Sequence, residues 1–269
     1  MTSTILKFLA LLLLATAANA FAATPAPVFL EDLTWTELRD EIGAGKTTII
    51  VPIGGTEQNG PHIALGKHNA RVKALSEKIA RELGNALVAP VLAYVPEGSV
   101  NPPTEHMRFP GTITVPDVTF EKLLESAARS FKLHGFRDVV FLGDHGGYQK
   151  DLQAVAATLN KEWAATPVRA HAIVEYYRAT NTAYVAVLQK RGFTADEIGT
   201  HAGVADTSLS LALTPGMVRG ERLGNAPKPA ASDGVYGDPR RSSAEVGQLG
   251  VDAFVAATVA AFRQVTTRR

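Results

Sequence analysis

Short runs of aliphatic and β-branched residues alternate along the chain with longer stretches whose apolar positions recur every three or four residues. Runs of the first kind predict buried strands, and stretches of the second kind predict amphipathic helices. The expected strands cover residues 47–53, 87–91, 138–142 and 167–174, and the expected helices cover residues 34–44, 70–83, 116–134, 150–163, 178–190, 203–213 and 243–264. This alternation is typical of a layered α/β fold.

Local end signals support several of these boundaries. Thr34 and Glu37 have the spacing of a capping box at the start of a helix. Gly135 follows the helix over 116–134 and is expected to close it, because glycine accepts the left-handed conformation that ends many helices. Residues 215–242 are rich in glycine, proline and arginine, so they are expected to form a surface loop.

The first twenty residues have the layout of a secretory signal. They combine a positive charge at Lys7, an apolar run from Phe8 to Ala18, and Ala18-Asn19-Ala20, which has the A-x-A form of a cleavage site. The run is shorter than the about 20 residues that a transmembrane helix needs, which disfavours the alternative of an uncleaved anchor. The sequence therefore predicts a signal peptide over 1–20, a single α/β domain over 21–269 and a periplasmic or secreted location.

The composition is that of an ordinary globular protein, with 46% hydrophobic and 20% charged residues among 269. There are 27 basic and 26 acidic residues, and this balance creates no overall field that would attract nucleic acid or an anionic membrane. The chain has no cysteine, which excludes disulfides, thiolate metal sites, cysteine nucleophiles and a lipoprotein anchor. Any catalytic chemistry must come from the remaining polar side chains.

Polar side chains and glycines follow two of the expected strands. The first strand is followed by Glu57, Asn59, His62 and His68, and the third is followed by Asp144 and His145. Because ligands of open α/β sheets bind beyond the carboxyl ends of the strands, these groups are expected to meet at one edge. Without cysteine, imidazole and carboxylate are the usual ligands of zinc and similar ions. The residues alone therefore predict a hydrolytic metal site.

Two competing sites have weaker support. The segment GDHGGY is neither G-x-G-x-x-G nor a Walker motif with its lysine, so it does not indicate a phosphate-binding loop. A Ser-His-Asp hydrolase is disfavoured because the chain has no G-x-S-x-G elbow.

Five motifs in order resemble the creatininase (creatinine amidohydrolase) family. The family pattern P-x-G-s-x-E-Q-H-G-P-H-L-P-L-x-x-D corresponds to VPIGGTEQNGPHIALGKH, and H-x-x-F-P-G-T corresponds to HMRFPGT at residues 106–112. The patterns N-G-H-G-G-N and H-A-G-x-x-E-T-S correspond to GDHGGY and to HAGVADTS at residues 201–208, and a late G-D-P occurs at residues 237–239. The resemblance covers about residues 33–265.

The resemblance implies a three-layer α/β/α sandwich with a mostly parallel central sheet, a homo-oligomer, and divalent-metal hydrolysis of a C–N amide bond. The chain is accordingly expected to be a metal-dependent amidohydrolase that acts on a cyclic or linear small-molecule amide. No nucleic acid is expected as a partner, and no membrane after the signal is cleaved.

The metal positions of the family are only partly kept. Glu57 and His145 fall on ligand positions and retain ligating residue types, whereas Asn59 replaces a histidine and His68 replaces an aspartate that bridges two metals. Gly147 stands where creatininase itself has a carboxylate ligand. A neutral imidazole offers a single lone pair, so His68 cannot bridge two ions as a carboxylate does. We therefore predict one ion, zinc or alternatively manganese, held by Glu57, His68 and His145 with an open place for water.

Expected roles can also be given to the other polar residues, and those of His201 and Asp206 come from the resemblance. His201 falls on the position of a catalytic histidine and Asp206 replaces the glutamate of E-T-S, so either is expected to pass a proton to the leaving nitrogen. Asn59 and the backbone amides of Gly146 and Gly147 are expected to donate hydrogen bonds to the oxyanion. His106 is a candidate for the substrate pocket. Structural roles are expected for the other three histidines, His62 in its loop, His134 at a helix end and His171 in a strand.

Two alternatives stay open at this point. The substitutions at Asn59 and His68 are compatible with a catalytically inactive secreted protein that binds a small metabolite in the same pocket. A metal-dependent hydrolase of another bond, in a peptide or a lactone, is also compatible, because the metal chemistry is common to these reactions.

Overall fold

Four parallel strands form the central sheet of the molecule. The computed structural model describes residues 26–267, so the predicted signal peptide lies outside the described residues. The strands are β1 (Thr48–Ile53), β2 (Ala86–Val88), β3 (Asp138–Gly143) and β4 (Arg169–Ala172), and they are arranged in the order β2-β1-β3-β4. Every pairing in this sheet is parallel, as the alternation of strands and helices predicted.

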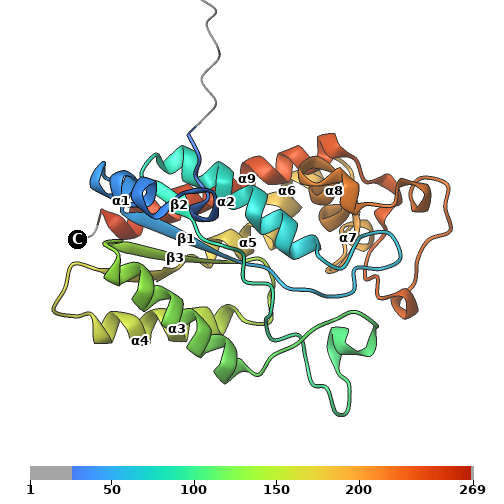
Figure 1. The fold of residues 1–269 in the computed structure, drawn as a ribbon. Coiled ribbons are helices and arrows are strands. Elements are labelled where there is room, and N and C mark those ends of the chain that lie inside the picture. Colours follow the sequence, from blue (N-terminus) through green and yellow to red (C-terminus); the bar gives the residue numbers. More distant parts are fainter. Residues whose placement is uncertain (1–25, 268–269) are drawn as a thin grey trace, which may run out of the picture.

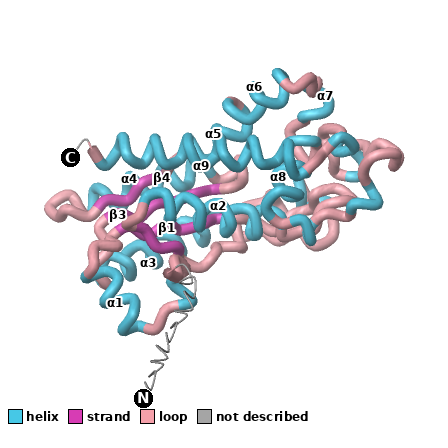
Figure 2. Tube along the Cα trace, turned by 90° about the horizontal axis from the view of Figure 1, so that it is seen from above, coloured by secondary structure: helices cyan, strands magenta, loops and turns pink. Residues whose placement is uncertain are grey.

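Helices cover both faces of the sheet, which makes a three-layer α/β/α sandwich and confirms the expected fold (Figure 1, Figure 2). On one face lie α3 (Asp117–Leu133) and α4 (Gln149–Glu162), and on the other lie α2 (Lys67–Leu83) and the long α9 (Ala244–Thr266). The remaining helices are α1 (Trp35–Gly43), α5 (Glu175–Asn181), α6 (Ala183–Lys190), α7 (Ala195–Ile198) and α8 (Val204–Leu213).

The strand side chains alternate between two hydrophobic cores. Ile50 and Val140 belong to the core shared with α2, α5, α8 and α9, whereas Ile49 and Phe141 belong to the core shared with α3 and α4. Because successive strand residues point to opposite faces, strands that are covered on both sides must be apolar throughout. This requirement explains the uninterrupted apolar runs of β1 and β3.

Most helix boundaries agree with the sequence prediction. Thr34 caps α1 in a capping box with Glu37, as expected. The helix predicted over 178–190 is instead two helices that meet at Thr182, whose backbone is not helical. The Thr182 hydroxyl donates to the carbonyl oxygen of Arg178, and such side-chain bonds compete with helical hydrogen bonding. The short helix α7 was not predicted, and residues 215–242 form a loop with isolated 3₁₀ turns, as expected.

Among the described residues, α9 is the one helix whose length and apolar composition would allow it to cross a membrane. It also packs against α2, α5, α6 and α8 and buries Phe254 and Phe262 in the core. Its apolar character is therefore explained by its position in the sandwich.

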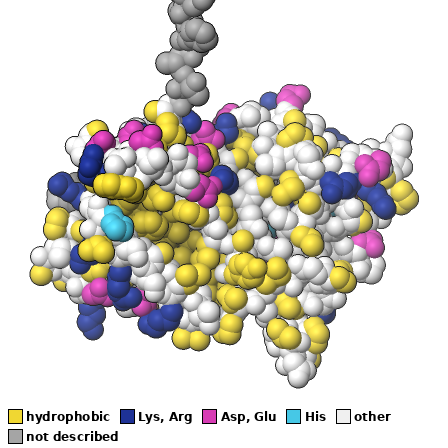
Figure 3. All heavy atoms as spheres, viewed as in Figure 1, with side chains coloured by type: hydrophobic (Ala, Val, Ile, Leu, Met, Phe, Trp, Pro, Cys, Tyr) yellow, Lys and Arg dark blue, Asp and Glu magenta, His cyan; other side chains and the backbone are white. Residues whose placement is uncertain are grey.

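Apolar side chains also gather on the surface between α1 and α3 (Figure 3). Trp35 of α1 is 75% exposed and Leu133 of α3 is 80% exposed. The predicted homo-oligomer stays a prediction, because a single chain does not test it.

Tyr148 ties together the two strand ends that the sequence singled out. Register places Ile53 of β1 opposite Gly143 of β3, so the segments that follow leave the sheet side by side. The buried Tyr148 hydroxyl donates to the carbonyl oxygen of Gly54 at 2.6 Å and accepts from the amide of His145 at 3.1 Å. The phenol of Tyr148 therefore connects the loop after β1 to the loop after β3 by hydrogen bonds.

Tyr148→Phe should lower the free energy of unfolding by about 3 kcal/mol, because it leaves a buried carbonyl and a buried amide without their partner. Urea denaturation followed by circular dichroism measures this change. Tyr94→Phe is the matched control, since Tyr94 is exposed and its hydroxyl is not needed for buried groups. Equal stability of the two variants would contradict the crosslinking role.

Candidate metal centre

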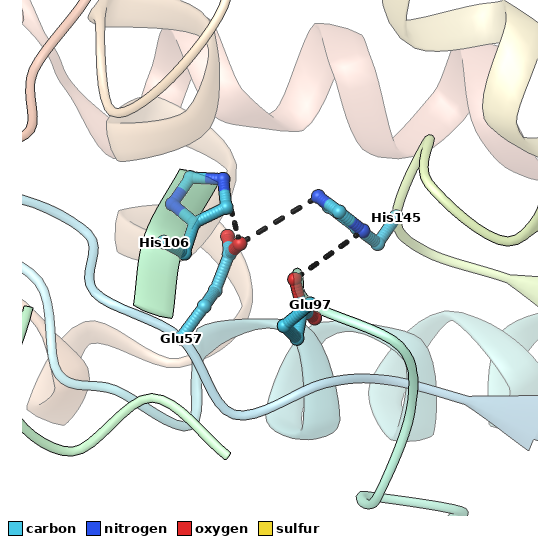
Figure 4. Close-up of side chains that lie close together, drawn as sticks. All are labelled: Glu57, Glu97, His106 and His145. Atoms are coloured by element: carbon cyan, nitrogen blue, oxygen red, sulfur yellow. Dashed lines mark ion pairs between the residues drawn. The ribbon is translucent and has the colours of Figure 1, made fainter. Parts of the chain in front are cut away.

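Four side chains from three loops converge beyond the carboxyl edge of the sheet. They are Glu57, Glu97, His106 and His145, and each offers a donor atom within 4.8 Å of the others (Figure 4). Glu57 follows β1, Glu97 follows β2, and His145 follows β3. His106 comes from a 3₁₀ turn at Glu105–Arg108. The sheet thus brings three strand ends to one point, as open α/β sheets do at their ligand sites.

The distances within this group suit a divalent ion. Nε2 of His106 is 3.1 Å from Oε2 of Glu57, and Nε2 of His145 is 3.6 Å from the same oxygen. Nδ1 of His145 is 3.6 Å from Oε2 of Glu97. Tetrahedral zinc with bonds of 2.0–2.2 Å to nitrogen and oxygen places neighbouring donor atoms about 3.3–3.6 Å apart. The spacing of the donors therefore fits a metal site.

Three of the four carboxyl oxygens of the group have no hydrogen-bond partner among the described residues. Oε2 of Glu57 and both carboxyl oxygens of Glu97 are buried and accept no hydrogen bond from the described residues. Burial, and after it the negative charge of Glu57, raises the pKa of Glu97 to about 9. A cation shared by the two carboxylates would offset this repulsion and occupy the free lone pairs. The chemistry of the donor set thus fits a metal.

The imidazoles of the group are in the form that binds metals. Burial lowers the pKa of His145 to about 4, and burial also lowers the pKa of His106. Both rings are therefore neutral at pH 7 and keep a lone pair for a ligand bond.

His68, a predicted ligand, lies beside this group and is not one of its four members. Its Nδ1 is 2.6 Å from Oδ2 of Asp144, and its Nε2 is 2.7 Å from Oε1 of Glu57. Both ring nitrogens are thus engaged with carboxylates. The sequence predicted His68 as a metal ligand, whereas the structure places it in the first turn of α2, where it orients the carboxylate of Glu57.

Arg71 connects the same network to Asp206. Its fully buried guanidinium donates to Oδ2 of Asp144 at 2.7 Å and to Oδ1 of Asp206 at 2.6 Å. Burial opposes ionisation of Asp206, yet Lys67 and Arg71 outweigh it and hold the pKa of this carboxyl well below its usual range. Asp206 therefore stays ionised and pairs with Lys67 and Arg71. This arrangement does not fit its predicted role in proton transfer.

His201 lies in the cavity wall, where its predicted catalytic role requires it. Its Nε2 is 3.0 Å from the carbonyl oxygen of Gln58, and its Nδ1 is 3.7 Å from Oε1 of Glu57. Burial, followed by the charge of Lys67, lowers the pKa of His201 to about 3. The side-chain amide nitrogen of Gln58 lies 3.0 Å from Nδ1 of His106 and 3.2 Å from Nε2 of His201, so Gln58 positions both rings.

Asn59 and the two glycines do not have the placement expected for oxyanion donors. The buried Asn59 amide donates to the carbonyl oxygens of Glu57 and Ala64, which fixes the loop after β1. The Gly147 amide donates to Nδ1 of His145. A Cβ on Gly146 would stand 2.6 Å from the hydroxyl of Tyr177, so glycine here permits close packing of that side chain. Among the described residues, the cavity wall includes Tyr177 but does not include Gly146, Gly147 or Asn59.

The site opens into a cavity of about 350 Å³. His106 lies in its wall, as predicted for a substrate-pocket residue, and also belongs to the candidate metal group. Polar and aromatic side chains form much of the remaining wall, among them Lys67, Arg108, Tyr177, Asn181, His201 and Tyr236. A cavity of this size and polarity suits a small polar molecule.

The structural histidines are placed as the sequence predicted. His62 is buried and joins its loop to the carbonyl oxygen of Ala202 at 3.1 Å. His134 follows the last residue of α3, and His171 lies in β4, where its Nε2 is 2.7 Å from Oδ1 of Asp138.

Sequence reasoning did not identify Glu97 as a site residue. The available signal was its position after the second expected strand, next to Gly98, which makes it a third acidic strand end at the same edge. Lys67, Arg71 and Gln58 were also missed, because nothing in their spacing distinguishes them from ordinary helix or loop residues.

Comparisons with known proteins identify the family of the chain. The sequence model of the creatininase family, described as creatinine amidohydrolase, matches residues 31–262. Creatinine amidohydrolase of Pseudomonas putida is 28% identical over 205 residues, which cover 74% of this chain and 77% of that protein. The mycofactocin precursor peptide peptidase of Mycolicibacterium smegmatis is 28% identical over 221 residues, which cover 74% of this chain and 78% of that protein.

A solved structure titled "Creatininase Mn" superposes with a TM-score of 0.72 and 25% identity, covering 88% of this chain and 98% of that one. The matched fold and the buried carboxylate–imidazole group agree with the match to the family model. The chain belongs to the creatininase family, a family of metal-dependent amidohydrolases.

Proposed function

We propose that this chain hydrolyses a C–N amide bond of a small polar substrate bound in the cavity, using one divalent ion held by Glu57, Glu97, His106 and His145. The observation that carries the proposal is the set of buried carboxyl oxygens without hydrogen-bond partners that face neutral imidazoles. Zinc and manganese both accept such ligands. This ligand set replaces the predicted set, in that Glu97 and His106 enter and His68 becomes an orienting residue.

The fourth carboxyl group of the network explains why a divalent ion would bind. Glu57, Asp144 and Asp206 are paired with Lys67, with Arg71 and with His68, both of whose ring nitrogens face carboxylates. Glu97 has no such partner, and its raised pKa keeps it protonated near pH 7. A divalent cation would take the place of that proton, because metal ligands bind in their deprotonated form.

A bound divalent ion supplies Lewis acidity and lowers the pKa of a water ligand toward about 7. The residues of the chain orient and protect the reaction. His68 fixes Glu57 through two hydrogen bonds, one to Glu57 and one to Asp144. When Nε2 of His201 donates to the Gln58 carbonyl oxygen, Nδ1 keeps its lone pair on the side of Glu57. There it can take a proton from the attacking water and pass it to the leaving nitrogen.

The substrate class follows from the cavity and the relatives. The names of the relatives describe one that acts on creatinine and one that acts on a precursor peptide, so both cyclic and linear amides occur among them. The small volume of the cavity and its polar wall support a small amide over a long peptide. We also propose that the protein acts in the periplasm or outside the cell, as a homo-oligomer.

Glu97→Gln should lower metal affinity at least about tenfold, because it removes one of the two buried carboxylates that face the imidazoles. Metal per chain, measured after purification without chelator and supplementation with zinc or manganese, should be about one equivalent for the wild type. Glu105→Gln is the control, since Glu105 lines the cavity but lies outside the donor group. A wild type without metal would contradict the proposal and favour the inactive metabolite-binding alternative.

His145→Ala should abolish both metal binding and turnover of a panel of cyclic and linear amides. The imidazole faces both carboxylates of the group, so its loss removes the centre of the donor set. His134→Ala is the matched histidine control, because His134 lies at the end of α3, outside the described site. Full metal occupancy in His145→Ala would exclude this ligand set.

His68→Gln distinguishes the proposed ligand set from the predicted one. If His68 only orients Glu57, the variant still binds about one ion, with an affinity about 10- to 100-fold lower. If His68 is itself a ligand, the variant loses the ion as completely as His145→Ala does. Isothermal titration with zinc separates these outcomes.

A further inference from the structure

Lys67 is a buried cation in the cavity wall that no hydrogen bond satisfies. The side chain is 1% exposed, and its ammonium nitrogen has no hydrogen-bond partner among the described residues. The nearest acceptors are Oδ2 of Asp206 at 3.4 Å and Oε1 of Glu57 at 3.7 Å. The three N–H groups of this ammonium group are thus held at the cavity without a hydrogen-bond acceptor among the described residues.

The position of this lysine is costly for the fold. Lys67 is the first residue of α2, where the helix dipole disfavours positive charge. Burying an ammonium group without hydrogen bonds adds a further cost. Residues whose position costs stability in this way tend to lie at functional sites, where a ligand can supply the missing contacts.

Glu57 links this ammonium group to the candidate metal group. Its Oε2 lies 3.1 Å from His106 and 3.6 Å from His145. Its Oε1 lies 2.7 Å from Nε2 of His68 and 3.7 Å from the ammonium nitrogen of Lys67. One carboxylate therefore has one oxygen in the candidate metal group and the other beside a buried cation. Hydrolases with two metal ions place those ions about 3.5–4 Å apart to stabilise both oxygens of the reaction.

We propose that the Lys67 ammonium group is a built-in second cation of this site, which takes the place of a second metal ion and donates a hydrogen bond to the carbonyl oxygen of the substrate amide. This inference rests on the proposed amide hydrolysis. The oxygen of water adds to the carbonyl carbon as His201 takes its proton, and the carbonyl π electrons move onto the carbonyl oxygen. That electron pair then re-forms the C=O bond, the C–N bond breaks with its electrons going to nitrogen, and the nitrogen takes the proton from His201. Lys67 keeps its own proton throughout and stabilises the negative charge on that oxygen.

Metal stoichiometry tests the first part of the proposal without relying on activity. Lys67→Ala leaves a space between the carboxylates of Glu57 and Asp206, and we expect this variant to bind two zinc ions per chain where the wild type binds one. Lys67→Met fills the space without charge, so we expect one ion, bound several-fold more tightly because a neighbouring positive charge is gone. Lys78→Met is the control, an exposed lysine on the same helix.

Kinetics test the second part with whichever substrate of the amide panel the wild type turns over. We expect Lys67→Met to lower kcat about 10²- to 10³-fold with a small change in KM, as loss of an oxyanion donor does. Lys67→Arg should recover part of kcat, because it restores a charged donor. Thermal melting verifies that each variant is folded.

The outcomes separate this inference from the proposed function. A wild type that binds no metal overturns the proposed function itself. A wild type with one ion and amide turnover leaves the function standing, and two results then overturn the role of Lys67. One is a folded Lys67→Ala variant that still binds a single ion, and the other is a Lys67→Met variant with wild-type kcat.

Discussion

The buried carboxylate of Glu57 is the constraint on which the rest of the site depends. A charge without access to water must be compensated by neighbours, and Glu57 is fully buried. Burial disfavours its charged form, but His68 and Lys67 outweigh this effect and hold its pKa well below the usual range. His106 and His145 approach its other oxygen. The surrounding residues are thus arranged to keep one carboxylate ionised inside the protein.

This compensation extends through a chain of paired charges to the framework of the fold. His68 connects Glu57 to Asp144 after β3, and Arg71 connects Asp144 to Asp206 at the start of α8. Tyr148 adds a neutral crosslink between the two strand ends. Catalytic groups need to be held within a fraction of an ångström, and side chains locked by such contacts satisfy that need. The same contacts therefore compensate the charges of the site and connect it to the fold.

The candidate metal centre of this chain differs from the family pattern within the same fold. Where the family pattern has a histidine and a bridging aspartate, this chain has Asn59, which fixes a loop, and His68, which orients Glu57. Glu97, His106 and Lys67 stand near the same carboxylate. Residues from distant parts of the sequence can act on one carboxylate in this way, because an electrostatic interaction depends on charge and distance and not on sequence order.

The sequence by itself determined the layers, most helix limits and two of the three strand ends that form the site. Apolar periodicity and caps are local properties, so they can be read directly, and Glu57 and His145 followed from their places after strands. Only the tertiary structure decided that Glu97 and His106 join them, that His68 turns behind Glu57 and that Lys67 is buried beside it. Those facts depend on which loop lies next to which strand and on how far water is excluded. Neither is a local property, because both arise only when distant segments pack together.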